Sequence, residues 1–189
     1  VLLNGPVWYF DNGTIRNMLL YFGGAVEYEK VDNFTDHVGL VGLNMQFRNN
    51  WGYEINFQYG KSKDFDVTFD SYQTNFSTWI GISPKWNANF WGGYAKTYNF
   101  ARNYLAFYNW YGAYFGWRVV PTFALGTDAG VFIEGNPDGK IEDITVNTRP
   151  FLSLTPINNL NLRLYVDNVF VRSTGKLERI IAGFLFSYN

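Results

Sequence analysis

Two neighbouring stretches of this sequence alternate strictly between apolar and polar side chains. Residues 41–47 place Val, Leu, Met and Phe at every second position, with Gly, Asn and Gln between them. Residues 51–60 repeat the pattern with Trp, Tyr, Ile, Phe and Tyr. Because neighbouring side chains of a β-strand point to opposite faces, each stretch predicts a strand with one apolar and one polar face. Phe47 and Trp51 share a face if residues 48–50 form a three-residue hairpin loop.

A short segment rich in turn-forming residues recurs along the chain. The segments are 11–13, 48–50, 83–85, 120–122 and the slightly longer 155–159, so their starting positions lie 37, 35, 37 and 35 residues apart. Gly, Pro, Asn and Ser in these segments favour tight turns. We interpret the regular spacing as one up-and-down pair of strands per repeat. The connections at the far end are expected to be longer and polar, at residues 30–36, 61–72, 98–102, 135–142 and 172–176.

The alternation continues through almost every remaining segment, which predicts an all-β fold. We expect an antiparallel, up-and-down transmembrane β-barrel, with about 10–12 strands and residues 1–189 as a single domain. Short turns at one end, longer loops at the other and strands of about ten residues are typical of outer-membrane barrels. One strand before residue 11 and two per repeat give about eleven, whereas bacterial single-chain barrels have even numbers. We therefore expect a fragment of a larger barrel, with at least one more strand before Val1.

The composition indicates which face of the strands meets lipid. Charged residues are 16% and aromatic residues 21% of the chain, whereas charged residues are about 25% of an ordinary soluble domain. The polar faces consist mainly of Gly, Ser, Asn, Gln and Thr rather than Lys and Glu. Trp51, Trp86 and Trp117 stand close to the short turns, where an interfacial aromatic belt belongs. The alternative is a soluble lipocalin-like or avidin-like barrel with an apolar interior.

Several classes of function are disfavoured by the same counts. A net charge of −1 argues against nucleic acid as a partner. Because the chain has no Cys, disulfides and thiolate metal sites are excluded, and we expect neither a metal nor a cofactor. No run of about 18 apolar residues is present, so a transmembrane helix is not expected.

Charged and amide side chains on the polar face are the first candidate functional residues. They carry both signs, whereas a selective pore more often concentrates one sign at a constriction. Mixed charge predicts cross-lumen ion pairs and a filled or narrow interior, because buried charges need partners. Arg149 and Arg163 lie on adjacent strands, so we expect an acidic neighbour to pair with them. The expected lumen-facing residues are Glu27, Glu54, Gln58, Asp128, Arg149, Arg163 and Asp167.

Trp79, Trp91 and Trp110 fall on the same polar face. If Ile82 lies opposite Trp86, then Trp79 pairs with Asn89 and Trp91 with Ser77, so that two indoles become diagonal neighbours. Such an aromatic platform could stack on a sugar ring or another flat ligand. The alternative is that these large side chains simply fill the lumen, as they do in small barrels.

Two further arrangements would give the chain a chemical activity. His37, the single histidine, follows Asp36, and Ser71 or Ser77 would complete a catalytic set at the rim of a barrel enzyme. The alternative is a solvated histidine at a loop end, since no spacing here fixes nucleophile–base geometry. Acidic residues alternate in the next loop region and could hold Ca²⁺, although the glycine and the terminal glutamate of a calcium loop are missing. These acidic residues are Asp64, Asp66 and Asp70.

The C-terminal third resembles a known family. Residues 148–156 (TRPFLSLTP), 160–165 (LNLRLY) and 184–189 (FLFSYN) are similar to the C-terminal barrel of one group of outer-membrane proteins. These proteins, common in Bacteroidetes-type Gram-negative bacteria, join an N-terminal family 9-like carbohydrate-binding domain to a barrel of unknown function. The resemblance implies an outer-membrane protein whose soluble domain would precede Val1. It supplies no catalytic residue.

The expected function is that of a non-enzymatic protein in the bacterial outer membrane. It would anchor a soluble domain, act as a subunit of an envelope assembly, or pass small solutes such as glycans. The expected partners are the lipid bilayer and other envelope proteins or glycans. The alternatives are a barrel enzyme with a rim site near His37 and a soluble lipocalin-like ligand-binding barrel.

Overall fold

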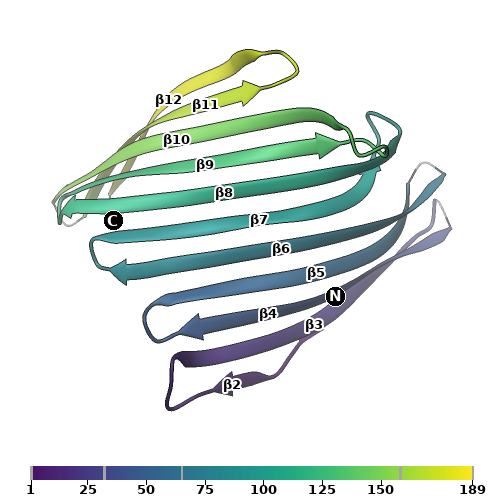
Figure 1. Cartoon of the computed structure of the whole chain (residues 1–189), viewed down its shortest axis with the longest axis horizontal. Helices are drawn as coiled ribbons and strands as arrows, with labels where there is room; N and C mark the ends of the chain where they lie inside the picture. Colours follow the sequence, from purple (N-terminus) through teal and green to yellow (C-terminus); the bar gives the residue numbers. More distant parts are fainter. Residues whose placement is uncertain (1, 32, 65, 158, 189) are drawn as a thin grey trace.

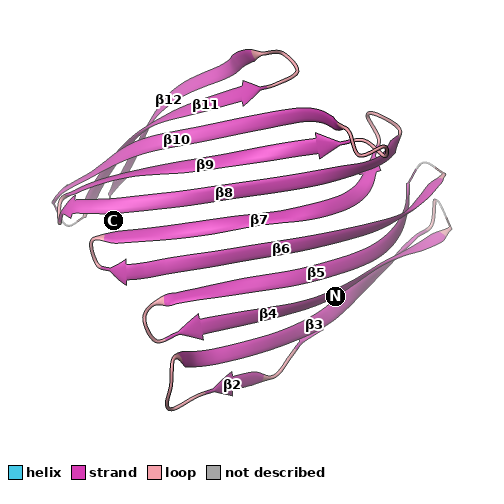
Figure 2. Ribbon diagram, viewed as in Figure 1, coloured by secondary structure: helices cyan, strands magenta, loops and turns pink. Residues whose placement is uncertain are grey.

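The computed structural model describes residues 2–31, 33–64, 66–157 and 159–188, which form one curved sheet (Figure 1). All of its secondary structure is β-strand (Figure 2). No helix that could cross a membrane is found among the described residues. The strands are β1 (Leu2–Asn4), β2 (Val7–Tyr9), β3 (Ile15–Glu29), β4 (Phe34–Phe47), β5 (Trp51–Asp64), β6 (Val67–Ser83), β7 (Trp86–Asn99), β8 (Tyr104–Val120), β9 (Phe123–Gly135), β10 (Ile141–Ile157), β11 (Leu160–Val171) and β12 (Lys176–Tyr188).

The strands follow one another in sequence order across the sheet. From β3 to β12, each strand pairs antiparallel with the next, as expected for an up-and-down arrangement. β1 and β2 both pair with the outer edge of β3, opposite residues 22–24 and 17–19 respectively. They therefore occupy one strand position, interrupted at Gly5 and Pro6. The sheet has twelve strands in eleven positions, which confirms the predicted all-β antiparallel architecture and strand count.

The sheet is open between its two edges. In the part of the chain that the structure describes, β12 pairs only with β11, and β1 and β2 pair only with β3. The closed barrel predicted from the sequence is therefore not formed by these residues. Antiparallel alternation over eleven positions leaves both edge strands running in the same direction, so they cannot pair antiparallel with one another.

The hairpin between β4 and β5 forms as the alternation predicts. β4 ends at Phe47 and β5 begins at Trp51, with residues 48–50 between them. The two aromatic rings stack with centroids 3.8 Å apart and planes 4° apart. Asn50 has a φ of 61°, the left-handed conformation that closes a three-residue hairpin loop.

Two other predicted three-residue turns are shorter than expected. Ser83 lies opposite Trp86 and Val120 lies opposite Phe123, so each loop has two residues instead of three. An irregularity after Ile80, and another after Arg118, absorbs the one-residue difference. The last turn is also shorter than the predicted 155–159, because Ile157 lies opposite Leu160.

The connections at the other end are shorter than the sequence suggested. Most of 61–72 is strand, because β5 continues to Asp64 and β6 starts at Val67. Elsewhere the strands are separated only by residues 30–33, 100–103, 136–140 and 172–175. The prediction of long loops was wrong because polar residues there continue the strand ladder, with Lys61 opposite Asp70 and Lys63 opposite Thr68.

Glycines opposite aromatic residues set the packing of the polar face. In each case the ring lies across the glycine of the neighbouring strand, and a Cβ there would be closer than 3.0 Å to the ring. A glycine of this kind leaves backbone exposed, and the ring covers it, so large and small residues interlock. The pairs are Tyr21 with Gly42, Trp79 with Gly52, Trp91 with Gly112, Trp110 with Gly93, Phe151 with Gly126, and Tyr165 with Gly183.

This packing predicts a strong difference between two glycines of β4. Gly42→Ala should lower the free energy of unfolding by about 1–3 kcal/mol, because the new methyl group would overlap the Tyr21 ring. Gly39→Ala should be neutral or stabilising, since the nearest atom to its Cβ is the Tyr59 carbonyl oxygen at 4.0 Å and alanine lowers the entropy of the unfolded chain. Urea unfolding in detergent micelles measures both. Equal losses in the two variants would contradict the interlocking.

Candidate functional site

The two faces of the sheet differ in exposure in the opposite sense from a soluble protein. In β5, Ile55, Phe57 and Tyr59 are 44%, 44% and 45% exposed. Glu54 and Asn56, which alternate with them, are only partly exposed. We call the face of Ile55 the apolar face and that of Glu54 the polar face. Among the described residues, the buried hydrophobic side chains are few and mostly small: Ala88, Ala95, Ala106 and Phe151.

The strand register puts all seven predicted lumen-facing residues on the polar face. Glu54 lies opposite Asn44 and Ser77, and Gln58 lies opposite Gln73. Glu27 lies opposite Asp36 near the end of β3 and is exposed. The remaining four lie on the C-terminal strands: Asp128, Arg149, Arg163 and Asp167.

Glu54 is held by residues of two strands on one side of it. The Tyr21 hydroxyl donates to Glu54 Oε1 at 2.6 Å, and Asn44 Nδ2 donates to Oε2 at 2.8 Å. Tyr21 reaches Glu54 by crossing Gly42, which lies between them on β4. Both oxygens of this carboxylate therefore have protein donors.

Amide side chains beside Glu54 are also joined to one another. Gln73 Nε2 donates to Asn75 Oδ1, and Asn75 Nδ2 donates to Asn56 Oδ1, both at 2.9 Å. These contacts link β5 and β6 across the polar face. They satisfy groups that would otherwise be costly to shelter from water.

Arg149 and Asp167 form the strongest ion pair of the polar face. Arg149 Nε and Nη2 donate to the two oxygens of Asp167 at 2.8 and 2.7 Å, a bidentate geometry. Asp167 is only 8% exposed. Asp128 lies opposite Arg149 on its other side. The expected pairing of Arg149 with an acidic neighbour is formed, but between adjacent strands and not across a lumen.

Arg163 makes a different contact from the predicted one. Its guanidinium carbon lies 3.8 Å from the centroid of the Phe151 ring, a cation–π geometry. None of the ion pairs of the described residues includes Arg163. The expectation that one carboxylate serves both arginines was therefore wrong for Arg163, because Asp167 already receives both hydrogen bonds from Arg149.

Two of the three tryptophans on the polar face, Trp79 and Trp91, have the predicted partners. Trp79 lies opposite Asn89, and Trp91 lies opposite Ser77. Trp91 and Trp110 border a hollow of about 190 Å³, together with Glu54, Asn56, Asn75 and Ser77. Each of the three indoles lies across a glycine of a neighbouring strand and so packs on the sheet itself. The aromatic platform and the filled lumen both stay predictions.

Asp36, His37 and Ser71 of the predicted catalytic set border one hollow of about 270 Å³. Among the described residues, no hydrogen bond joins His37 to Asp36 or to Ser71. His37 lies opposite Lys61 on the apolar side of β4, whereas Ser71 lies opposite Gly60 on the polar side. Ser77 lies farther along β6, opposite Glu54. His37 Nδ1 is 3.5 Å from the backbone oxygen of Thr35. The register thus puts the side chains of His37 and Ser71 on opposite faces of the sheet, although both residues border this hollow.

The predicted calcium ligands are also engaged elsewhere. Asp66 forms an ion pair with Lys63 at 3.5 Å, and Asp70 accepts a hydrogen bond from the Tyr59 hydroxyl at 2.9 Å. Asp64 lies opposite Val67 at the end of β5. Over the described ranges, no three acidic or histidine side chains are grouped closely enough to hold a metal ion.

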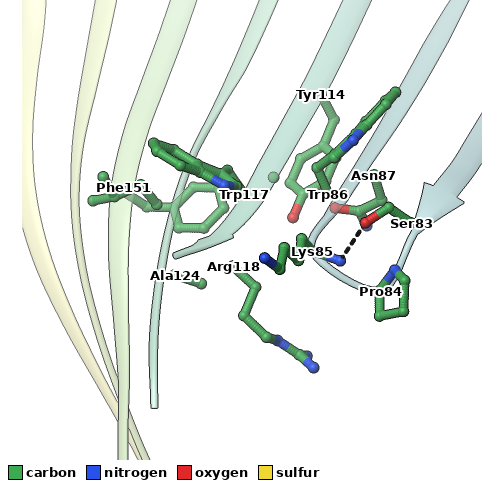
Figure 3. A pocket seen from close by; sticks show the side chains of 12 residues that line it. Ser83, Pro84, Lys85, Trp86, Asn87, Tyr114, Trp117, Arg118, Ala124 and Phe151 are labelled. Atoms are coloured by element: carbon green, nitrogen blue, oxygen red, sulfur yellow. Dashed lines mark hydrogen bonds between the residues drawn. The ribbon is translucent and has the colours of Figure 1, made fainter. Parts of the chain in front are cut away.

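A second hollow, of about 280 Å³, lies at the short-turn end of β7 and β8 (Figure 3). Its lining includes Lys85 and Arg118, neither of which the sequence reasoning singled out. A signal was present in the sequence, since Arg48, Lys85 and Arg118 each stand in or beside a short turn. The predicted turns depend only on the backbone preferences of their residues, which carry no information about side-chain charge.

Comparisons of the chain with protein-family models, curated proteins and solved structures gave no match. The family resemblance of residues 148–189 stays a prediction.

The ion pair on the polar face predicts a difference between two aspartates. Asp167→Asn should lower the free energy of unfolding by about 1–3 kcal/mol, because Arg149 loses a charged bidentate acceptor. Asp128→Asn is the control, since Asp128 lies opposite Arg149 without a hydrogen bond to it among the described residues. Urea unfolding of both variants checks this. A larger loss for Asp128→Asn would contradict the assigned pairing.

Proposed function

We propose that this chain forms part of the wall of a non-enzymatic β-barrel in a bacterial outer membrane. The observation that carries the proposal is the reversed exposure of the two faces. Ile55 and Phe57 are 44% exposed, whereas the polar residues between and beside them are less exposed. In a soluble ligand-carrying barrel the apolar side chains would be the sheltered ones. An exposed row of apolar side chains is stable when it faces the hydrocarbon interior of a bilayer.

Aromatic residues at both ends of the apolar face support a membrane position. Trp86 of β7 and Trp117 of β8 lie opposite one another at the short-turn end. At the other end, the Tyr94 ring lies 5.8 Å from Tyr72 and 6.1 Å from Phe107. Two belts of aromatic side chains bordering an apolar band are typical of transmembrane barrels.

The spacing of the two belts fits an outer membrane. Trp86 and Tyr94 are eight residues apart on β7, which corresponds to about 26 Å along a strand. A strand tilt of about 40° reduces this to a height of about 20 Å, suitable for a comparatively thin bilayer. The apolar-face positions between them are uncharged: Ala88, Phe90 and Gly92.

The polar face favours an anchoring or assembly role over an open passage. Glu54 has donors at both oxygens, and Arg149 and Asp167 satisfy each other. Trp79 lies across Gly52, which is two residues from Glu54 on the same face of β5. Side chains that pair among themselves form a filled interior rather than a hydrated route for solutes. The bilayer is the proposed partner, and a soluble domain or other envelope proteins would be held by the barrel.

Labelling along β5 tests the proposal, and the absence of native cysteine makes every introduced thiol unique. Nitroxide labels at Ile55→Cys and Phe57→Cys should collide readily with oxygen and poorly with a water-soluble nickel complex in lipid vesicles. Labels at Asn56→Cys and Gln58→Cys should collide less with oxygen, because they face away from lipid. Electron paramagnetic resonance measures both collision rates, and Asp138→Cys in the 136–140 connection is the water-exposed control.

Two results would contradict a membrane position. One is that the chain stays in solution without detergent and has no heat-dependent gel mobility. The other is that labels at 55 and 57 are shielded from oxygen and from the nickel complex alike, as in the core of a soluble barrel.

A further inference from the structure

The hollow at the short-turn end combines two cations with polar and aromatic side chains. Its wall includes Lys85, Asn87, Tyr114, Arg118, Ala124 and Phe151, and its volume is about 280 Å³. Figure 3 shows Lys85 between the Tyr114 ring and the Arg118 side chain. In the same view, the Arg118 side chain extends away from the Phe151 ring.

The backbone fixes both cations at this position. The Arg118 backbone N–H donates to the Lys85 carbonyl oxygen at 2.5 Å, which joins the β6–β7 turn to β8. The Lys85 backbone N–H donates to Ser83 Oγ at 2.9 Å, which closes the turn itself. The two side chains therefore start from adjoining points of a hydrogen-bonded framework.

Neither cation is neutralised within the described part of the chain. The ion pairs there are Lys63–Asp66, Arg102 with Glu134 and Glu142, and Arg149–Asp167. The polar-face carboxylate that comes next along β9 is Asp128, four residues from Ala124 and opposite Arg149. The hollow is thus a positively charged region on a chain whose net charge is −1.

A third cation stands on the same cross-strand row. Arg118 lies opposite Ala124, Ala124 opposite Ser153, and Ser153 opposite Arg163. The two residues between the arginines are small, and Ala124 lines the hollow. Arg163 rests on the Phe151 ring at 3.8 Å, and Phe151 lines the hollow.

We propose that this hollow binds a phosphate group between Lys85 and Arg118. Inorganic phosphate and phosphate monoesters carry nearly two negative charges at neutral pH, so they match two cations better than a carboxylate or a phosphodiester, each of which carries one. The Arg118 guanidinium offers paired donors and the Lys85 ammonium a point charge, the two usual partners of phosphate. Asn87 and Tyr114 supply further donors beside them.

The aromatic floor suits a phosphate attached to an organic group. The rings of Tyr114 and Phe151 stack with centroids 5.9 Å apart and planes 15° apart. The two rings border the cations on one side with an apolar surface. Beside such a surface, the attraction between the cations and a bound phosphate is stronger than in open water. The source of the phosphate is either a free small molecule or a lipid headgroup reaching the short-turn rim.

Calorimetric titration of inorganic phosphate into the full chain in non-ionic detergent micelles tests the proposal. We expect saturable binding of one phosphate per chain and weaker binding of acetate. The double variant Lys85→Gln with Arg118→Gln should raise the apparent Kd by about tenfold or more, because both charge-assisted contacts are lost. The matched control is Lys140→Gln with Arg172→Gln, which removes two cations at the opposite end of the sheet.

Three results would overturn the proposal. They are the absence of saturable phosphate binding, equal affinity in the two double variants, and acetate binding as tightly as phosphate. The single variant Lys85→Gln changes a turn residue and should bind phosphate more weakly than the unmodified chain. An unaltered circular dichroism spectrum would show that this variant is folded. The proposal requires only the hollow, so it is tested separately from the membrane location.

Nanodiscs separate the two sources of phosphate. If a lipid headgroup occupies the hollow, discs of phosphatidylcholine with phosphatidic acid, whose headgroup is a phosphate monoester, should abolish the binding of added inorganic phosphate. If the ligand is a free small molecule, binding should be unchanged between these discs and discs of phosphatidylcholine alone.

Discussion

The register of the antiparallel ladder is the constraint on which every other feature of this sheet depends. Because side chains alternate with a period of two, a slip of one residue in any pair would move a whole row to the opposite face. Such a slip would place Glu54 among exposed apolar residues and would separate Arg149 from Asp167. The apolar row of Ile55 and Phe57 and the network around Glu54 are thus two results of one alignment.

Complementary sizes on the polar face help to hold that alignment. Where a soluble protein secures its register by burying apolar side chains, this sheet buries only three alanines and one phenylalanine among the hydrophobic residues described. Rings lying across glycines take over that role, because a displaced ring would meet a neighbour that has a side chain. The same arrangement lets Tyr21 reach across a strand to Glu54, so packing and hydrogen bonding reinforce each other.

Features that depend on alternation could be predicted from the sequence, and features that depend on strand ends could not. The hairpin at residues 48–50 follows from the alternation of side chains. The pairing of Trp79 with Asn89 was derived from Ile82 opposite Trp86, whereas Ser83 lies opposite Trp86, and it holds because the irregularity after Ile80 offsets the difference. The two-residue turn before Trp86 was not predicted. The irregularity after Ile80 offsets the missing loop residue, so the side chains before it stay on the faces that the alternation predicts. The region around Lys61 was predicted to be a loop because its residues are polar. Polarity alone does not distinguish a loop from paired strands that continue beyond the apolar part of the sheet.

The candidate sites show the same division. Strand parity placed Glu54, Arg149 and Asp167 on one face, but it could not specify which carboxylate would pair with which arginine. The contact of Arg163 with Phe151 joins diagonal neighbours on adjacent strands, and alternation does not encode which diagonal neighbour a long side chain reaches. Lys85 lies in a turn, where no periodic pattern applies, and its proximity to Arg118 follows from a single backbone hydrogen bond.

The eleven strand positions have a geometric consequence for any complete cylinder that contains this sheet. Its two edges run in the same direction, and β12 has exposed apolar residues on both faces, including Ile181 and Phe184. An edge of this kind readily accepts another strand. If all neighbours in the cylinder are antiparallel, the strands that bridge the gap must be odd in number, whichever polypeptide contributes them.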